Sequence, residues 1–341
     1  MCIRWFEKRR LGRGLLLRAG LPVLLSVWLL SGCRAAPVQD ADDGRLYVVT
    51  TVFPYYDFVR QIAGDKVRLK LVVPAGMDSH SFEPTPADVI AIQEADILIR
   101  NGGSMEHWLD DVLGALDTSE MTIVTMMDYV DIVEEEIVEG MEAESHSHGE
   151  EDHSRDEETD GHEQEIEYDE HIWTSPANAA ALTGVICDTL AEKDPGNGDA
   201  YQEHTAHYQR QLKELDQAFW DVVNHGKRKI MVVADKFPFR YFADEYGLDY
   251  RAAFTGCSSD TEPSAQTIAY LIDKVREEQI PAVYYLELST PRVAEIIQEE
   301  TGAEPMLFHS CHNVTRKEFD EGVTYLQLMK NNVEALRAGL N

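Results

Sequence analysis

Positive charge and cysteine are both scarce in this sequence. Its 341 residues include 30 lysines and arginines against 62 aspartates and glutamates, a formal charge of −32. A nucleic-acid-binding protein needs basic side chains to neutralise phosphates, so we expect no nucleic-acid partner. Five cysteines are too few for a fold held by disulfides. The 44% hydrophobic residues suffice for real cores, and the length suggests about two domains.

Several enzyme motifs are missing as well. The sequence has no His-Glu-x-x-His helix, no convincing pair of nucleophile and base, and no phosphate-loop or dinucleotide fingerprint. We therefore expect a protein that is not an enzyme. An exported zinc hydrolase stays as an alternative, because a metal site with an open coordination position can hydrolyse substrates.

The N-terminus has the pattern of an export signal. Residues 1–32 carry six basic residues and one acidic residue, and the apolar stretch 21–30 is too short for a membrane-spanning helix. The stretch ends in Leu-Ser-Gly-Cys at Cys33, which resembles a bacterial lipobox whose cysteine is lipidated. An ordinary cleavage site nearby is the alternative. We expect a signal peptide over 1–32, a tether over 33–44, and a protein anchored to the lipid bilayer on the outer face of the cytoplasmic membrane or the periplasmic side.

Export to an oxidising compartment changes how the cysteines are interpreted. Cys257 and Cys311 each follow a predicted strand, and we predict that they form a disulfide. Cys187 lies in an apolar helical run, where a buried free thiol is expected.

The rest of the chain alternates predicted strands and helices in two runs. Strands are predicted in eight segments: 45–52, 67–74, 97–100, 122–126, 229–234, 251–254, 282–287 and 305–308. Repeated strand-helix units predict an α/β fold with two parallel-sheet lobes. We expect the first lobe at 45–198, one long rigid linking helix at 199–225, and the second lobe at 226–341, which ends in a helix over 317–340. Ligands of such folds bind beyond the carboxyl ends of strands, so the cleft between the lobes is the expected site.

Histidines stand close to those strand ends. His80 follows the second strand, His171 precedes a helix, and His309 and His312 follow the last strand. Asp235 follows the first strand of the second run. Imidazoles bind zinc-like cations well, and carboxylates can complete the shell. The pattern therefore favours a metal site.

Five segments are similar to a known family: 50–54, 76–86, 170–173, 239–248 and 262–264. They resemble the metal-binding receptors of bacterial ABC importers for zinc and manganese, in which a rigid helix links two lobes. The resemblance runs from about residue 46 to residue 340. It implies that the chain captures Zn²⁺, with Mn²⁺ as the alternative, and that its partners are an ABC permease and the associated ATPase. It also implies that His80 and His171 are ligands from the first lobe.

The second lobe departs from the family pattern. Five residues before Tyr241, where the family usually carries His or Glu, this chain has Lys236. A protonated lysine cannot coordinate and repels a dication, so we expect Lys236 to pair with an acid such as Glu287. The last family ligand, commonly an aspartate, falls at or near His312.

The predicted metal ligands are therefore His80, His171 and His312. The fourth donor stays open between four candidates: Asp235, Glu287, His309 and water. Three imidazoles favour zinc over manganese, because a harder cation prefers more oxygen ligands. We expect the protein to be a monomer.

An acidic segment interrupts the first run. Residues 134–170 hold 18 acidic residues and one arginine. Four histidines lie among them: His146, His148, His153 and His162. A segment with so few apolar side chains cannot bury a core, so we expect a disordered loop over about 134–167. It is interpreted as a low-affinity zinc trap beside the cleft, or as a solvated loop that only adds charge.

Another class of function competes with transport. Some relatives have been described as surface adhesins, so the chain is alternatively a cell-adhesion or structural lipoprotein in which the metal is a structural staple. Exchangeable metal and a partner permease would distinguish the receptor from the adhesin.

Overall fold

The computed structural model describes residues 43–141, 167–258 and 262–341. Residues Gly44–Asn341 form one compact unit. The predicted signal peptide, Cys33 and the four histidines of the acidic segment lie outside the described residues. Within the described part, no helix has the length and apolar character needed to cross a membrane.

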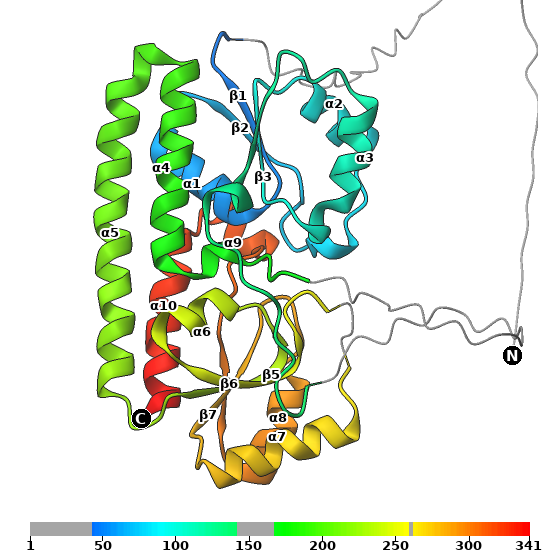
Figure 1. The fold of residues 1–341 in the computed structure, drawn as a ribbon, viewed down its shortest axis with the longest axis vertical. Helices are drawn as coiled ribbons and strands as arrows, with labels where there is room; N and C mark the ends of the chain where they lie inside the picture. The colour runs from blue at the N-terminus through cyan, green and yellow to red at the C-terminus, as the bar shows by residue number, and fades with distance from the viewer. Residues whose placement is uncertain (1–42, 142–166, 259–261) are drawn as a thin grey trace, which may run out of the picture. The chain divides into compact units, whose positions relative to one another are not determined.

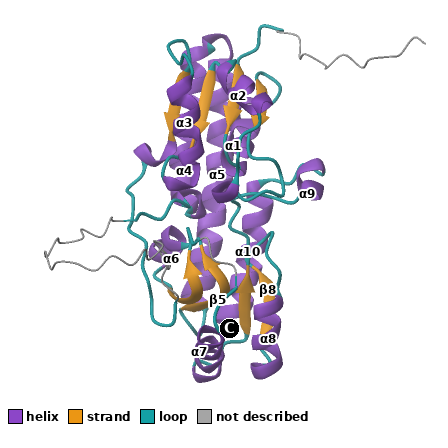
Figure 2. Cartoon of the chain, turned by 90° about the vertical axis from the view of Figure 1, so that its right-hand side faces the viewer, coloured by secondary structure: helices purple, strands orange, loops and turns teal. Residues whose placement is uncertain are grey.

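The first lobe is built on a parallel four-stranded sheet with the order β2-β1-β3-β4 (Figure 1). Its strands are β1 (Tyr47–Thr50), β2 (Arg68–Leu71), β3 (Ile97–Arg100) and β4 (Thr122–Thr125). Its helices are α1 (Phe53–Ala63), α2 (Pro86–Gln93) and α3 (His107–Ala115). Successive strand residues face opposite sides: Val49 packs with α2 and α3, whereas Val48 packs with α1. Figure 2 shows α2 and α3 beside these strands.

The second lobe repeats the arrangement with the order β6-β5-β7-β8. Its strands are β5 (Ile230–Phe237), β6 (Asp249–Thr255), β7 (Ala282–Tyr285) and β8 (Glu304–Leu307). The helices that alternate with them are α6 (Arg240–Tyr246), α7 (Ala265–Glu277) and α8 (Arg292–Thr301). All eight strands overlap the predicted segments, although β5, β6 and β8 extend beyond them, and the α/β fold with two parallel sheets is confirmed.

A 28-residue helix, α5 (Gly198–His225), follows α4 (Pro176–Lys193) and leads into the second sheet. Its buried side chains recur at steps of four and three: Tyr201, Thr205, Tyr208, Leu212, Leu215, Phe219 and Val222. A mean step of 3.5 residues keeps one seam toward the neighbouring helices. This seam packs on α1, α4 and α10 (Tyr325–Leu340).

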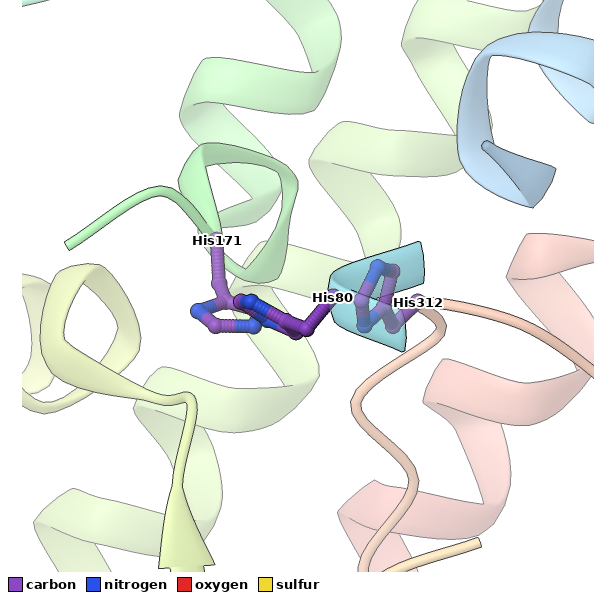
Figure 3. A group of neighbouring side chains, drawn as sticks. All are labelled: His80, His171 and His312. Carbon is purple, nitrogen blue, oxygen red and sulfur yellow. The ribbon is translucent and has the colours of Figure 1, made fainter. Parts of the chain in front are cut away.

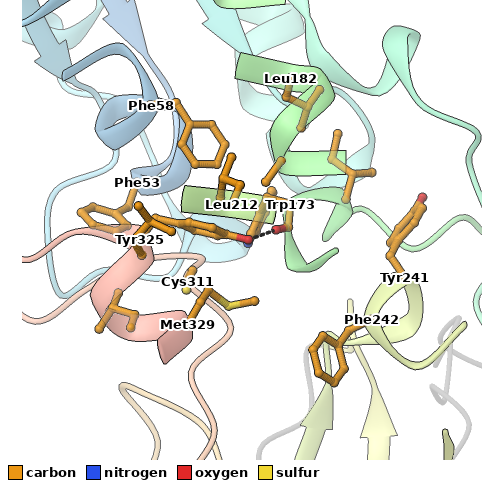
Figure 4. Packing of buried hydrophobic residues seen from close by; sticks show 14 of the residues in the cluster. Phe53, Phe58, Trp173, Leu182, Leu212, Tyr241, Phe242, Cys311, Tyr325 and Met329 are labelled. Atoms are coloured by element: carbon orange, nitrogen blue, oxygen red, sulfur yellow. Dashed lines mark hydrogen bonds between the residues drawn. The ribbon is translucent and has the colours of Figure 1, made fainter. Parts of the chain in front are cut away.

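One hydrophobic core joins the two lobes through these helices. Figure 4 shows Phe58 of α1, Leu212 of α5, Tyr325 of α10 and Phe242 of α6 in this core. The hydroxyl of Tyr325 donates a hydrogen bond to the carbonyl of Trp173 at 2.7 Å. This core contains residues of both lobes and therefore marks no boundary between them. The domain limits expected from the sequence stay predictions.

The predicted C-terminal helix over 317–340 is wrong as a single element. Two helices occur instead, α9 (Arg316–Asp320) and α10, with Gly322 between them at a positive φ of 74°. Thr315 and Thr324 each begin one of these helices with a capping box. Such a box satisfies two free N–H groups at a helix start, so each threonine favours its own helix.

The predicted disulfide between Cys257 and Cys311 is also wrong, because both are free thiols. Cys257 follows β6 and Cys311 follows β8, which stand at opposite edges of the sheet. Three strand spacings amount to about 14 Å, whereas the Cα atoms of a disulfide lie within about 7 Å of each other. Cys187 is a buried free thiol, as predicted.

Candidate metal centre

His80 lies on a short 3₁₀ turn, Ser79–Ser81, in the loop that follows β2. Asp78 caps this turn, and its Oδ1 accepts a hydrogen bond from His80 N at 3.0 Å. Nε2 of His80 is buried and has no hydrogen-bond partner among the described residues. Buried polar atoms are normally paired, so an unpaired imidazole nitrogen that faces a cleft suits a metal ligand.

His171 stands just before the 3₁₀ turn Ile172–Thr174, which leads into α4. Asp169 holds it in two ways: Oδ1 accepts a hydrogen bond from His171 N at 2.7 Å and lies 3.3 Å from His171 Nδ1. A carboxylate at Nδ1 favours the proton on that nitrogen and leaves Nε2 free to bind a metal.

His312 belongs to the segment that follows β8, which runs back against the first lobe. Its carbonyl accepts a hydrogen bond from Phe53 N at 3.4 Å. Ser79 Oγ is hydrogen-bonded to His312 Nε2. Trp173 Nε1 donates to the carbonyl of Ser310 at 2.8 Å. No local pattern in the sequence signals these partners, because the contacts join segments more than 130 residues apart.

The three imidazoles meet at one place (Figure 3). Their ring centroids are 6.1 Å apart for His80 and His171, 5.6 Å for His80 and His312, and 5.5 Å for His171 and His312. One nitrogen from each ring lies within 4.8 Å of the others. Across the described residues, this is the one group of three or more possible ligands that could share an ion. The structure therefore brings together the three predicted ligands.

The pKa values of the three imidazoles shift in different directions. Burial, the neighbouring His171 and Lys236 lower the pKa of His80 to about 4, although Asp78 acts in the opposite direction. Burial and the same neighbours lower the pKa of His312 well below its usual range. Burial also acts to lower the pKa of His171, but the carboxylates around it, Asp169 first, outweigh burial and raise it. His80 and His312 are therefore neutral and ready to bind a cation at neutral pH.

The three side chains considered as the fourth metal ligand do not lie in this group. Glu287 Oε2 accepts a hydrogen bond from Ser310 N at 2.8 Å. Nδ1 of His309 accepts a hydrogen bond from Cys311 N at 2.9 Å and lies 3.4 Å from Glu287 Oε1. Asp235 accepts one from Lys236 N at 2.8 Å. Each of these three candidates is engaged on the second lobe through the atoms named, while Nε2 of His309 is buried and has no hydrogen-bond partner among the described residues.

Lys236 pairs across the cleft, and not with the predicted Glu287. Its Nζ lies 3.9 Å from Asp78 Oδ2. The register of β5 shifts between Val233 and Lys236, which breaks the strict alternation of side chains. Asp235 and Lys236 consequently both line the cleft, although they are adjacent in a strand. This cleft has a volume of about 490 Å³ and is also lined by the three histidines.

The first residues of the acidic segment are placed against the second lobe. Val133 O accepts a hydrogen bond from Asp169 N, and Tyr241 Oη donates to the carbonyl of Asp169 at 2.8 Å. Glu135 Oε1 accepts a hydrogen bond from Cys257 N at 2.9 Å. A Cβ on Gly140 would come within 2.1 Å of the Tyr270 ring, so the backbone there lies directly on α7.

The expected disorder is therefore wrong for residues 134–141, which pack on the second lobe. Residues 142–166 lie outside the described residues. We call residues 133–141 the strap. It leaves the first lobe after β4, contacts the second lobe, and pairs with the segment that carries His171.

Comparisons with known proteins agree with this geometry. Residues 48–339 match the family described as ZnuA, zinc-uptake complex component A, periplasmic. The chain is 31% identical over 318 residues to the zinc-binding lipoprotein AdcA of Streptococcus pneumoniae; the match covers 92% of this chain and 60% of that protein. It is 30% identical to the high-affinity zinc uptake system protein ZnuA of Bacillus subtilis, covering 94% and 97% of the two chains.

A solved structure shows the same fold. The Zn(II)-bound ZnuA-like domain of Streptococcus pneumoniae AdcA matches with a TM-score of 0.69 and 27% identity, over 87% of this chain and 99% of that one. The chain thus spans about 60% of the length of AdcA but nearly all of its ZnuA-like domain. With two such lobes, a shared core and a family match over residues 48–339, the chain belongs to the zinc-uptake component A family.

Proposed function

We propose that this protein is the extracytoplasmic receptor of an ABC importer. It captures Zn²⁺ in the cleft through His80, His171 and His312 and delivers the ion to a membrane permease driven by an ATPase. The observation that carries the proposal is the convergence of three imidazoles from three separate segments. The names of the relatives, which refer to zinc binding and zinc uptake, support it.

The chemistry of the site favours zinc over manganese. Three nitrogen donors suit Zn²⁺, whereas Mn²⁺ prefers carboxylate, carbonyl and water oxygens. Asp169 and Ser79 hold two of the rings in fixed orientations, as partners of metal-binding histidines do. We propose Zn²⁺ as the cargo and Mn²⁺ as a weaker competitor.

A metal-competition titration tests this function. Chelator-stripped protein should bind Zn²⁺ much more tightly than Mn²⁺. Replacing His80, His171 or His312 by Ala should weaken zinc affinity by more than about a hundredfold, since losing a ligand costs more than losing its partner. The matched control is His225→Ala, because that side chain is 79% exposed at the end of α5. Equal affinities for the two metals would contradict the zinc assignment.

Further variants identify the fourth donor. Asp235→Asn, Glu287→Gln and His309→Ala should each change zinc affinity by less than about threefold. None of these side chains belongs to the group of three histidines, so its loss removes no metal ligand. A loss as large as that of the histidine variants would make the altered residue a ligand. Protein lacking residues 142–166 should keep the tight site and lose only weaker binding by its four histidines.

Location and assembly complete the proposal. Cys33 is the lipidation site and holds the mature protein at the membrane as a monomer. Incorporation of labelled palmitate that disappears in Cys33→Ala would support the anchor, and unchanged incorporation would contradict it. Metal that exchanges freely with a chelator distinguishes a carrier from an adhesin with a structural metal.

A further inference from the structure

The three-imidazole group is one donor short of a closed zinc site. Closed sites hold Zn²⁺ with four ligands. Among the described residues, the side chains close enough to share one ion are three imidazoles and no carboxylate. Neutral imidazoles leave the double positive charge of the ion uncompensated, so its fourth position favours an anion.

Lys236 adds a second positive charge at the same place. Its Nζ lies 3.9 Å from Asp78 Oδ2, which is longer than a hydrogen bond, and its side chain is only 15% exposed. Lys236 lines the same cleft as His80 and His312, and Asp78, which it faces, also accepts a hydrogen bond from His80 N at 3.0 Å. A bound dication and this ammonium group would repel each other unless a negative group lay between them.

Two acids on the second-lobe wall of the cleft, Glu287 and Asp235, already accept hydrogen bonds from other donors. Glu287 accepts hydrogen bonds from both the backbone N and the hydroxyl of Ser310. Asp235 is bound to the backbone of Lys236. Asp78 is the one acid in the described structure that forms an ion pair with Lys236, and its side chain is 46% exposed. Within the described residues, the negative group between ion and ammonium is therefore Asp78 or Glu262, which also lines the cleft, unless it comes from an anion bound there.

We propose that the chain captures zinc together with a small carboxylate anion. One carboxylate oxygen is the fourth zinc ligand, and the other accepts a hydrogen bond from Lys236 Nζ. The cleft volume of about 490 Å³ accommodates both the ion and a small organic acid, and Ser289 and Thr290 line the same space. This inference rests on the proposed zinc-binding function.

Cobalt spectroscopy tests the inference. Co²⁺ replaces Zn²⁺, and its visible absorption reports the number and type of ligands; acetate is the probe anion. In the full chain, acetate should change the spectrum in a saturable way. Lys236→Met should still bind Co²⁺ but weaken the acetate response at least about tenfold, because one charge-assisted hydrogen bond is lost. Lys236→Arg should retain the response, and Lys317→Met, at an exposed lysine of α9, should leave it unchanged.

Several outcomes would overturn the inference. If acetate leaves the Co²⁺ spectrum unchanged, or changes it equally in the unaltered chain and in Lys236→Met, Lys236 binds no anion at the metal. A response seen only in Asp78→Asn, or only after deletion of residues 142–166, shows that a group of the chain already fills the position. If the unaltered chain failed to bind Co²⁺ and Zn²⁺, the proposed function itself would be wrong.

Discussion

The two lobes are built on the same sheet order but play different parts at the site. In each sheet the second strand stands at one edge, followed by the first, third and fourth. The loop after β2 carries His80, whereas the equivalent loop after β6 carries Cys257. The backbone N of Cys257 donates a hydrogen bond to Glu135 of the strap. The three imidazoles lie against the first lobe, and the second lobe presents Asp235, Lys236 and Glu287. The comparison teaches that a shared scaffold sets where loops meet, while loop residues decide the chemistry.

The first prediction tests whether the lobes are energetically separate. Phe58→Ala in the first lobe and Phe242→Ala in the second should each lower the free energy of unfolding by about 3–5 kcal/mol. Both rings are fully buried in the same core. We therefore expect one cooperative transition in urea for both variants, with a shifted midpoint. Two separate transitions would show that each lobe unfolds on its own. The exposed Leu307, at 40% exposure, provides the control variant Leu307→Ala.

The second prediction compares how strongly each lobe positions His171: the first through the Asp169 carboxylate, the second through the Tyr241 hydroxyl. Asp169→Asn should weaken zinc affinity by about 10–100-fold, the usual cost of losing a partner of a metal-binding histidine. Tyr241→Phe removes the hydroxyl through which the second lobe binds the Asp169 carbonyl, and should cost only a few-fold. Competition with a zinc-binding dye measures both affinities. An equal loss in the two variants would mean that the second lobe positions His171 as strongly as its own carboxylate does.

The third prediction concerns pH. His171 has a raised pKa, so it is the first of the three imidazoles to take up a proton as pH falls, and zinc must displace that proton. Affinity should fall by about tenfold per pH unit once the pH drops below the pKa of His171. His80, with a pKa of about 4, and His312 stay neutral over that range.

Asp169→Asn should move the onset of this fall to lower pH, because the carboxylate that stabilises the protonated ring is gone. Zinc titrations between pH 5 and 8 (a range set by ordinary histidine titration) measure the onset. The same onset in both proteins would show that another group controls the pH dependence.

The smallest expected effect is at Cys257. Cys257→Ala should change the free energy of unfolding by less than about 1 kcal/mol, because the hydrogen bond to Glu135 comes from the backbone N of Cys257, which alanine keeps. A disulfide to Cys311 would close a long loop and contribute about 3–4 kcal/mol. Denaturation with and without reductant measures the difference. A large loss of stability on adding reductant would show that Cys257 and Cys311 do form a disulfide.

The sequence alone was enough for the fold class and for picking out three histidines that the structure brings together. Alternating apolar runs and helical patterns predicted the eight strands, because burial on both sides of a parallel sheet demands continuous apolar segments. His80, His171 and His312 were recognised from their places at strand ends and from the family resemblance. Local signals decide such features, since they need no knowledge of distant partners.

Tertiary structure decided everything that depends on distant segments. Cys257 and Cys311 both follow strands, but the sheet order puts them at opposite edges, and no local pattern reveals that order. Lys236 pairs with Asp78, not Glu287, because the irregularity in β5 turns it toward the other lobe. The strap packs on the second lobe although its composition is that of a solvated loop. Charge and hydropathy along the chain predict which residues are exposed, but only packing determines which residues face each other across the cleft.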